Sequence, residues 1–411
     1  MHARSFFPLI LLLGAVVTPS LGLIVPSPLR SSPVWCAQGV RRESCSYGSN
    51  IAYSRNPAWT GLHTASSADS NFASSENVND MKISASSTEQ KQKPPFPVVL
   101  WKFTRPHTII GSALAIPALH ILAAPTIGAA FTGKALSAMA YAMIPALLMN
   151  LYITGLNQIT DVEIDKINKP NLPIAAGILS MKTATITVIV SLFLSLYLGV
   201  ANPKFATEGL NAALWLSGIM GTLYSLPPFR LKRFPVMAAV CIVAVRGAVI
   251  NASFFAHSFA AAYGGVASGS IILTCLRNNS ACYLSSMFFG VFGLVIALMK
   301  DVPDVAGDEQ ANVRTFSVRV GQKAVYTAMR RLLSGSFLAV GAAFLRSAFM
   351  APTKYLVAGR IVTSVAAILA GWSTRREAQG VDPEDSQQVY NYYMHLWKLF
   401  YLSYLVLPFA R

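Results

Sequence analysis

Long apolar runs recur along most of this chain, and they restrict its possible folds more than any other feature. About nine of them have the length that an α-helix needs to cross the hydrocarbon core of a bilayer. They cover residues 108–128, 135–156, 183–201, 208–226, 236–256, 281–299, 326–345, 354–372 and 393–409. The run at 326–345 is the weakest candidate, because Arg330 and Arg331 shorten its apolar part. The pattern predicts an all-α integral membrane protein with about nine transmembrane helices, since helices satisfy their own backbone polar groups in lipid.

The composition supports a membrane protein and argues against a soluble one. Of the 411 residues, 54% are apolar and only 12% are charged. The net charge of +16 would suggest a nucleic-acid partner in a soluble chain. Here the basic residues lie largely near the N-terminus and in loops beside the apolar runs, so a lipid bilayer and anionic ligands are expected instead. The five cysteines form no CxxC or Cys/His pattern that would indicate zinc or a redox centre.

The N-terminal part of the chain differs from the rest. Residues 1–22 have a weakly basic start, an apolar core and small residues at the end, which is typical of a signal peptide. Residues 23–97 are rich in Ser and Arg, which is typical of a transit peptide and a linker without a fold of its own. Together they predict import into a plastid of secondary origin, and a secreted protein with a Ser-rich tail is the alternative. Residues 98–411 form the predicted membrane domain.

Two short acidic segments each follow an apolar run. In the first, one Asn and two Asp recur every four positions, so a helix would present them on one face. In the second, three Asp are spaced by three and four positions, and Pro303 and Gly307 interrupt the helix among them. The six positions are Asn157, Asp161, Asp165, Asp301, Asp304 and Asp308. Oxygen ligands without nearby His or Cys predict a Mg²⁺ site. The alternative is that these acids only mark where spans leave the membrane.

The alternation of spans predicts that both acidic segments face the same side of the membrane. The segments after the second, fourth, sixth and eighth runs share a side with the N-terminal entry. That side also receives the basic loop 227–233 and Arg375-Arg376, whereas the opposite loops carry few basic residues. This asymmetry agrees with the positive-inside rule. The two acidic segments are therefore expected to meet around one polar central cavity.

Basic residues near the acidic segments suit a ligand that is half diphosphate and half hydrocarbon. Carboxylates do not bind diphosphate directly, so a Mg²⁺ ion between them is expected. Lys169, Arg230, Lys232 and Arg246 can neutralise the remaining phosphate charge. Arg246 lies inside an apolar run, where an unpaired charge is costly, and the alternative is a structural pairing with a neighbouring helix. Tyr224, at the end of the fourth apolar run, belongs either to this polar site or to an interfacial aromatic belt.

Both acidic segments match motifs of a known family. Residues 157–177, NQITDVEIDKINKPNLPIAAG, resemble the first aspartate motif of the UbiA superfamily of membrane aromatic prenyltransferases. Residues 300–322, KDVPDVAGDEQANVRTFSVRVGQ, resemble its second motif. Further marks are FTRPHTIIG at 103–111, GTLYSLPPFRLKRFPV at 221–236, VRG at 245–247 and WKLFYLSYLVLPF at 397–409. From about residue 98 to the C-terminus, the chain is similar to the homogentisate prenyltransferases of plastids, the phytyl and solanesyl transferase branch.

The resemblance implies a UbiA-type helical bundle and a reaction. The reaction is Mg²⁺-dependent transfer of a long prenyl group, phytyl or solanesyl, from its diphosphate to homogentisate with loss of CO₂. It would make a precursor of tocopherol or plastoquinone. The residues implied to hold Mg²⁺ and diphosphate are Asn157, Asp161, Asp165, Asp304 and Asp308, with Asp301 close by. Lys169, Tyr224, Lys232 and Arg246 match positions that contact the diphosphate or shape its site, with Tyr224 and Lys232 grouped with the aspartates as catalytic. Arg105 matches a position near the aromatic substrate.

Two alternatives and one question stay open at this point. Chlorophyll synthases of the same superfamily usually carry Asn-Asp where this chain has Asn157-Gln158, and another UbiA prenyltransferase is a further possibility. A polytopic transporter is the alternative of another class, because it too would place charges in its spans. The length of the prenyl chain depends on the reach of the hydrophobic tunnel between helices, and the sequence does not mark its walls.

Overall fold

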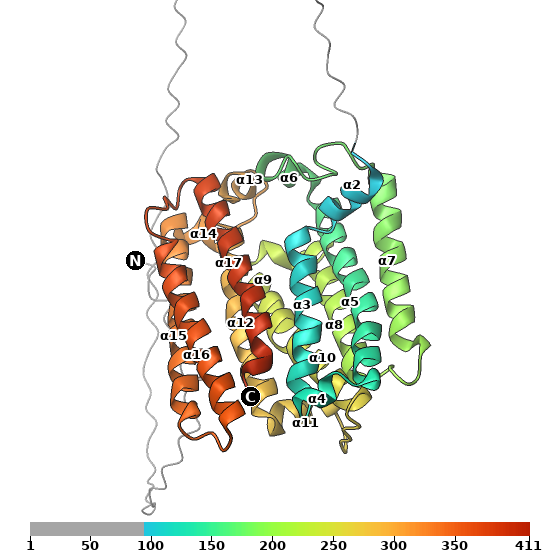
Figure 1. Cartoon of the computed structure of the whole chain (residues 1–411). Helices are drawn as coiled ribbons and strands as arrows, with labels where there is room; N and C mark the ends of the chain where they lie inside the picture. Colours follow the sequence, from blue (N-terminus) through green and yellow to red (C-terminus); the bar gives the residue numbers. More distant parts are fainter. Residues whose placement is uncertain (1–93) are drawn as a thin grey trace, which may run out of the picture. The chain divides into compact units, whose positions relative to one another are not determined.

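The computed structural model describes residues 94–411, and every regular element in that part of the chain is helical. The predicted signal peptide, and the predicted transit peptide up to residue 93, lie outside the described residues. Long helices run side by side through the described part, and short ones close its two ends (Figure 1). This arrangement confirms the predicted all-α architecture.

Seven helical segments in residues 94–411 are long and apolar enough to cross a membrane. They are α3 (Pro106–Ala123), α5 (Gly133–Thr160), α7 (Met181–Ala201), the continuous segment Pro235–Ala261, α12 (Ser280–Lys300), α15 (Gln322–Ala348) and α16 (Lys354–Arg376). The segment Pro235–Ala261 consists of α9 (Pro235–Val243), the π-helix η3 (Ala244–Ala252) and α10 (Ser253–Ala261). The weakest predicted run, at 326–345, is thus part of a candidate span despite its two arginines.

The expected count of about nine spans is not confirmed. The two other predicted runs are indeed helical, as α8 (Glu208–Ser225) and α17 (Ser386–Val406). Both are more polar than the seven spans of residues 94–411: α8 begins with Glu208 and contains Asn211, and α17 begins with Ser386-Gln387-Gln388. Polar first turns lower the mean hydropathy of a helix without preventing it from joining the bundle.

Short helices connect the long ones. They are α2 (Phe96–Phe103), α4 (Ile127–Ala130), α6 (Val162–Asn168), η2 (Leu231–Arg233), α11 (Ile271–Asn278), α13 (Val305–Gln310), α14 (Phe316–Val320) and η4 (Leu407–Phe409). Several long helices begin at a Ser or Thr whose hydroxyl accepts a bond from a backbone N–H of the first turn. Ser180 does so at 3.1 Å for α7, and Thr207 does so at 3.2 Å for α8. Such caps fix where apolar helices start.

Helix α12 lies at the centre of the bundle. In its apolar stretch, 72% of the residues are buried, compared with 28–39% in the other candidate spans. Aromatic side chains fill the space between it and α17: the rings of Phe289 and Tyr404 stack with centroids 3.8 Å apart, and Phe292 meets Phe400 at 5.2 Å. Because α12 ends at the second acidic segment, this packing fixes the position of that segment.

Close approach of η3 to α12 requires small residues at the crossing. A Cβ added at Gly247 would lie 2.9 Å from the Cα of Gly290 and 3.0 Å from the carbonyl oxygen of Ser286. Small residues permit this kind of contact between membrane helices. We expect Gly247→Ala to destabilise the protein by roughly 1–3 kcal/mol through overpacking. Thermal unfolding in detergent measures this effect.

The matched control for that substitution is Gly335→Ala in α15. Apart from the adjacent backbone of α15, no atom of residues 94–411 lies within 4 Å of a Cβ added at Gly335, so this variant should melt like the wild type or slightly higher. Equal melting temperatures for the Gly247 variant and the wild type would contradict the close crossing.

Both acidic segments lie at the same end of the bundle, where α6 and α13 are neighbours (Figure 1). The predicted meeting of the two segments is therefore confirmed. The first segment is not one uninterrupted helix, however. Helix α5 ends at Thr160 and α6 begins at Val162, with Asp161 between them at a φ of −116°. Sequence spacing misses this break, because it depends on partners of Asp161 that come from a distant loop.

Candidate active site

The first acidic segment places its polar groups around the break at Asp161. The Asn157 side-chain amide donates to Asp161 Oδ2 at 2.8 Å, and the Asp165 backbone N–H donates to the Asp161 carbonyl at 2.7 Å. The break turns the chain from the membrane span into α6 while it keeps the three residues together. One hydrogen bond to its carboxylate and one to its backbone carbonyl therefore position Asp161.

Two basic residues of the loop after α8 bind Asp161. Arg230 Nη2 lies 3.0 Å from Asp161 Oδ1, and Lys232 forms a close ion pair with the same oxygen. Arg230 has a left-handed backbone with a φ of 38°, a strained conformation that is common at functional sites. Burial alone would raise the pKa of Asp161, but Lys232 and Arg230 outweigh it and hold that pKa below its usual value. Asp161 is thus a carboxylate at neutral pH.

Asp165 has a looser partner. Arg105 Nη2, from the residue before α3, lies 3.7 Å from Asp165 Oδ2, which is a long ion pair. Arg105 also has a positive φ of 52°. Within residues 94–411, Asp165 Oδ2 is buried and has no hydrogen-bond partner, and burial raises the pKa of this carboxyl. A buried oxygen without a donor is unusual in a folded protein and fits a ligand position that something else completes.

The second acidic segment is arranged around two lysines. Lys300, the last residue of α12, lies 3.0 Å from Asp301 Oδ1 and 3.9 Å from Asp304 Oδ2. Lys169, from the end of the first segment, forms a close ion pair with Asp304. Burial, together with the nearby negative charge of Asp301, raises the pKa of Asp308 to about 7. This segment can therefore accept further positive charge near neutral pH.

A single asparagine joins the two segments. Asn168 Nδ2 donates to the Asp304 carbonyl at 3.0 Å, and its Oδ1 accepts from the Gly307 backbone N–H at 3.0 Å. Both bonds run from the C-terminal end of α6 to the start of α13. The side-chain amide of Asn168 therefore fixes the distance between the two aspartate motifs.

The polar groups of both segments surround a small cavity of about 50 Å³. Ten of the predicted site residues line it: Arg105, Asn157, Asp161, Asp165, Lys169, Tyr224, Lys232, Asp301, Asp304 and Asp308. The eleventh, Arg246, does not. We call this space the acidic pocket. Arg230, which was also expected to neutralise phosphate charge, does not line the pocket but binds Asp161 from beside it.

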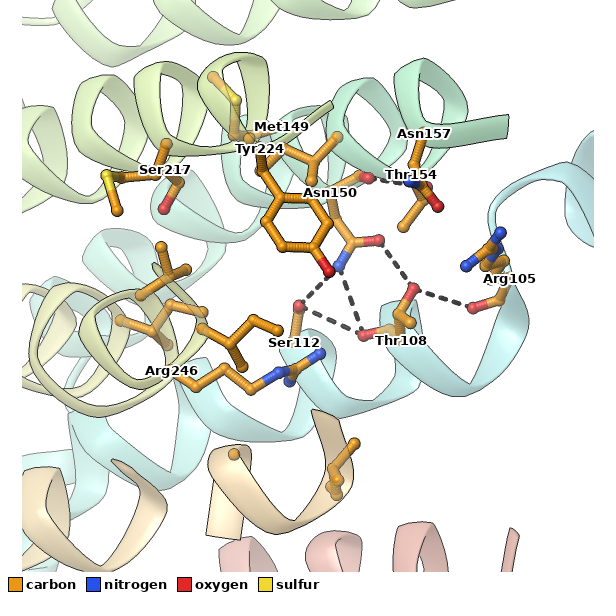
Figure 2. A pocket seen from close by; sticks show the side chains of 18 of the residues that line it. Arg105, Thr108, Ser112, Met149, Asn150, Thr154, Asn157, Ser217, Tyr224 and Arg246 are labelled. Atoms are coloured by element: carbon orange, nitrogen blue, oxygen red, sulfur yellow. Dashed lines mark hydrogen bonds between the residues drawn. The ribbon is translucent and has the colours of Figure 1, made fainter. Parts of the chain in front are cut away.

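A larger cavity of about 250 Å³ adjoins the acidic pocket within the bundle. The two share the lining residues Arg105, Asn157, Tyr224 and Lys300, so they are neighbouring parts of one site. Mostly apolar side chains of α3, α5, α8, α9 and α12 line the larger cavity, together with Arg246 and a small group of hydroxyl and amide side chains (Figure 2). This combination fits a ligand with a polar head and an apolar body.

The acidic pocket fits Mg²⁺ that arrives together with an anionic ligand. Within residues 94–411, no three Asp, Glu, His or Cys side chains converge closely enough to hold a metal ion by themselves. The carboxylates instead face lysine and arginine side chains. Mg²⁺ commonly takes one or two carboxylates and completes its coordination with phosphate oxygens and water. The oxygen donors present, including the unpartnered Asp165 Oδ2, meet that requirement.

Sequence reasoning missed two members of the site. Lys300 lines both cavities and binds two aspartates of the second segment, and Asn168 joins the segments. Lys300 directly precedes the motif DVPD, so a basic residue at the end of a span was an available signal. Asn168 lies within the first motif, directly before Lys169, but its spacing does not indicate its partners, which lie more than 130 positions away.

The fold and the site together define a multi-pass membrane protein with a charged pocket for an anionic head group beside an apolar cavity. Residues 102–399 match the model of the UbiA prenyltransferase family, and the chain belongs to this family. It is 36% identical to homogentisate phytyltransferase 1, chloroplastic, of Arabidopsis thaliana, over 76% of this chain and 75% of the relative. It is 35% identical to the homogentisate phytyltransferase of Synechocystis, over 75% of this chain and 94% of the relative.

A solved structure shares the fold. The UbiA homologue from Archaeoglobus fulgidus, bound to GPP and Mg²⁺, matches with a TM-score of 0.50 at 16% identity, over 75% of this chain and 99% of that one. The predicted UbiA-type bundle is therefore confirmed.

Proposed function

We propose that this protein transfers a long prenyl group from its diphosphate to homogentisate, with loss of the acceptor's carboxylate as CO₂. The observation that carries the proposal is the union of both aspartate motifs and their basic partners in one pocket beside an apolar cavity. The names of the two relatives reported above support homogentisate as the acceptor and phytyl as one donor. The choice between phytyl and solanesyl is left to the experiment below.

The residues of the acidic pocket divide into two roles. Asn157, Asp161, Asp165, Asp304 and Asp308 would hold Mg²⁺, with Asp301 beside them. When bound, Mg²⁺ supplies positive charge that stabilises the departing diphosphate. Lys169, Lys232 and Lys300, each of which pairs with one of these carboxylates, would donate to the phosphate oxygens. Arg105 and Arg230 can do the same from the strained loops that carry them.

The larger cavity would hold the reacting carbon atoms. The bond between the allylic carbon and the diphosphate oxygen breaks, and its electron pair leaves with the diphosphate. A carbon of the electron-rich ring supplies the electron pair of the new carbon–carbon bond. The ring proton lost there balances the proton that the acceptor's methylene carbon gains when CO₂ leaves. The apolar walls exclude water, which would otherwise capture the allylic cation.

The same proposal includes a location. We infer a plastid membrane, reached through a signal peptide at 1–22 and a transit peptide within 23–97, with 98–411 as the membrane domain. Chloroplast relatives and the candidate membrane spans support this location. The succession of a signal peptide and a transit peptide supports the further proposal that this plastid is of secondary origin.

A transfer assay tests the proposed function. The purified protein is incubated with homogentisate or chlorophyllide as the acceptor and with phytyl, geranylgeranyl or solanesyl diphosphate as the donor, with Mg²⁺ or with EDTA. We expect equal amounts of prenylated methylquinol, CO₂ and diphosphate with at least one donor, and no product with EDTA. Transfer to chlorophyllide but not to homogentisate would contradict the choice of acceptor. Absence of diphosphate release from every donor would contradict the enzyme itself.

A further inference from the structure

Arg246 is a membrane-embedded cation that the acidic pocket leaves out. It lies in η3, inside the candidate span Pro235–Ala261, and lines the larger cavity. Within residues 94–411 it forms no ion pair with a carboxylate. Its guanidinium lies instead over the rings of Trp397 and Phe400, with centroids at 5.1 and 5.5 Å. The structural alternative considered from the sequence, a pairing with a neighbouring helix, thus takes the form of aromatic contacts with α17, and these leave the charge without an anionic partner in the described residues.

The surroundings hold Arg246 in a fixed position. Asn251 donates from its side-chain amide to the Arg246 carbonyl, and Tyr404 in turn donates to Asn251 Oδ1 at 3.2 Å. On the other side, a Cβ added at Gly293 of α12 would lie 2.8 Å from Arg246 Cβ, so the two backbones approach closely there. The wide turn of a π-helix, which is frequent at functional sites, sets the direction of the side chain. Arg246 is therefore a preorganised cation.

The same cavity is also lined by a small polar group. Thr108 Oγ1 and Asn150 Oδ1 are 3.1 Å apart, and Asn150 Nδ2 donates to Ser112 Oγ at 3.1 Å. These side chains come from α3 and α5, and Arg246 extends toward the same part of α3 (Figure 2). Hydroxyl and amide groups in a mainly apolar cavity orient a ligand that has matching polar atoms.

The part of the cavity around Arg246 holds a cation for which the described residues provide no anionic partner. The acidic pocket already supplies Lys169, Lys232 and Lys300 for a diphosphate, with Arg230 beside it on Asp161. A prenyl chain is a neutral hydrocarbon and gives a guanidinium no partner. An unpaired charge inside a membrane is costly, so an anionic ligand is expected at Arg246. The guanidinium carbon lies 5.1 Å from the Trp397 ring centroid, and no carboxylate within residues 94–411 pairs with it, so its N–H groups can bind a bidentate carboxylate.

We propose that Arg246 binds the carboxylate of the aromatic acceptor and makes the site selective for acidic acceptors. The hydroxyl and amide group of Thr108, Ser112 and Asn150 then faces the ring hydroxyls. This inference rests on the proposed function and deepens it. It also differs from the role that the sequence resemblance implied for Arg246, contact with the diphosphate.

Acceptor kinetics test the assignment. Wild type, Arg246→Lys and Arg246→Leu are compared with homogentisate and with methylhydroquinone, a ring of similar size without a carboxylate. For Arg246→Leu we expect the KM for homogentisate to rise at least about tenfold, while the KM for the prenyl diphosphate stays within about twofold. Activity with methylhydroquinone, low in the wild type because this ring has no carboxylate, should not fall further in Arg246→Leu. Arg246→Lys keeps the charge but loses the planar fork, so its KM should lie in between.

The matched control is Arg346→Leu, which removes an exposed arginine near the end of α15 that lines neither cavity. Abundance in the membrane and melting temperature are measured for every variant. If Arg246→Leu does not accumulate, the ratio of the two acceptors in Arg246→Lys decides the matter. Equal losses with both acceptors, or a raised KM for the prenyl diphosphate alone, would overturn the assignment. Wild type that transfers nothing to homogentisate would instead overturn the proposed function, and this inference with it.

Discussion

Asp161→Asn and Asp304→Asn should each lower prenyl transfer at least about a hundredfold, with the protein still folded in the membrane. Asn keeps the size of the side chain but removes the negative charge that a Mg²⁺ ligand needs. Each of these aspartates also holds a lysine, Lys232 in one case and Lys169 in the other, so each variant frees a cation next to the diphosphate position. Turnover in purified protein, with abundance and melting temperature, measures the effect.

Glu163→Gln is the matched control for these variants. Glu163 lies in α6 between Asp161 and Asp165, but its side chain is exposed, pairs with Lys166 at 2.8 Å and lines neither cavity. Its removal should leave turnover within about twofold, since exposed pairs contribute little. Near-normal turnover in either aspartate variant would contradict a metal site built from both motifs.

Asn168→Ala should lower turnover by roughly 10- to 100-fold, the range seen when a residue that orients metal ligands is lost. The substitution removes both bonds between α6 and α13 and leaves the Asp304 carbonyl and the Gly307 N–H without their partner. The second motif can then shift relative to the first. Because Asn168 acts through Asp304, we expect the Mg²⁺ concentration for half-maximal rate to rise along with the loss of turnover.

Asn391→Ala provides the comparison for Asn168. Asn391 is exposed on α17, and its Oδ1 accepts a bond from Gln387 at 3.1 Å, so a side-chain amide is removed without touching the site. A drop in turnover for Asn168→Ala without any change in Mg²⁺ dependence would indicate a general loss of structure rather than a shift of the second motif.

The sequence predicted those parts of the molecule that depend on local pattern. Apolar runs place the helices, because length and hydropathy decide whether a segment can cross a bilayer. Counting spans predicted that both acidic segments face the same side of the membrane, and the contact between α6 and α13 confirms that they meet. The spacing of Asp161 and Asp165 predicted their proximity but not the break between α5 and α6.

The other features depend on partners that are distant in the chain. The binding of Asp161 by Arg230 and Lys232 joins positions about 70 apart, and Asn168 reaches residues more than 130 positions away. Arg246 shows the same limit: its charge within an apolar run indicated a function, but its position over Trp397 and outside the acidic pocket follows from how α17 packs beside α12. Spacing rules for helices and strands do not extend over such separations.

Binding of inorganic pyrophosphate tests most directly whether the two aspartate motifs form one Mg²⁺–diphosphate site. Purified protein is titrated calorimetrically with pyrophosphate, with and without Mg²⁺, for wild type, Asp161→Asn, Asp304→Asn and the double variant. A single site predicts one pyrophosphate per chain, bound only with Mg²⁺, and a double variant hardly weaker than either single variant, because residues of one unit are not additive. Binding of equal strength without Mg²⁺ would contradict the metal in this site, and losses that simply add would contradict a single site built from both motifs.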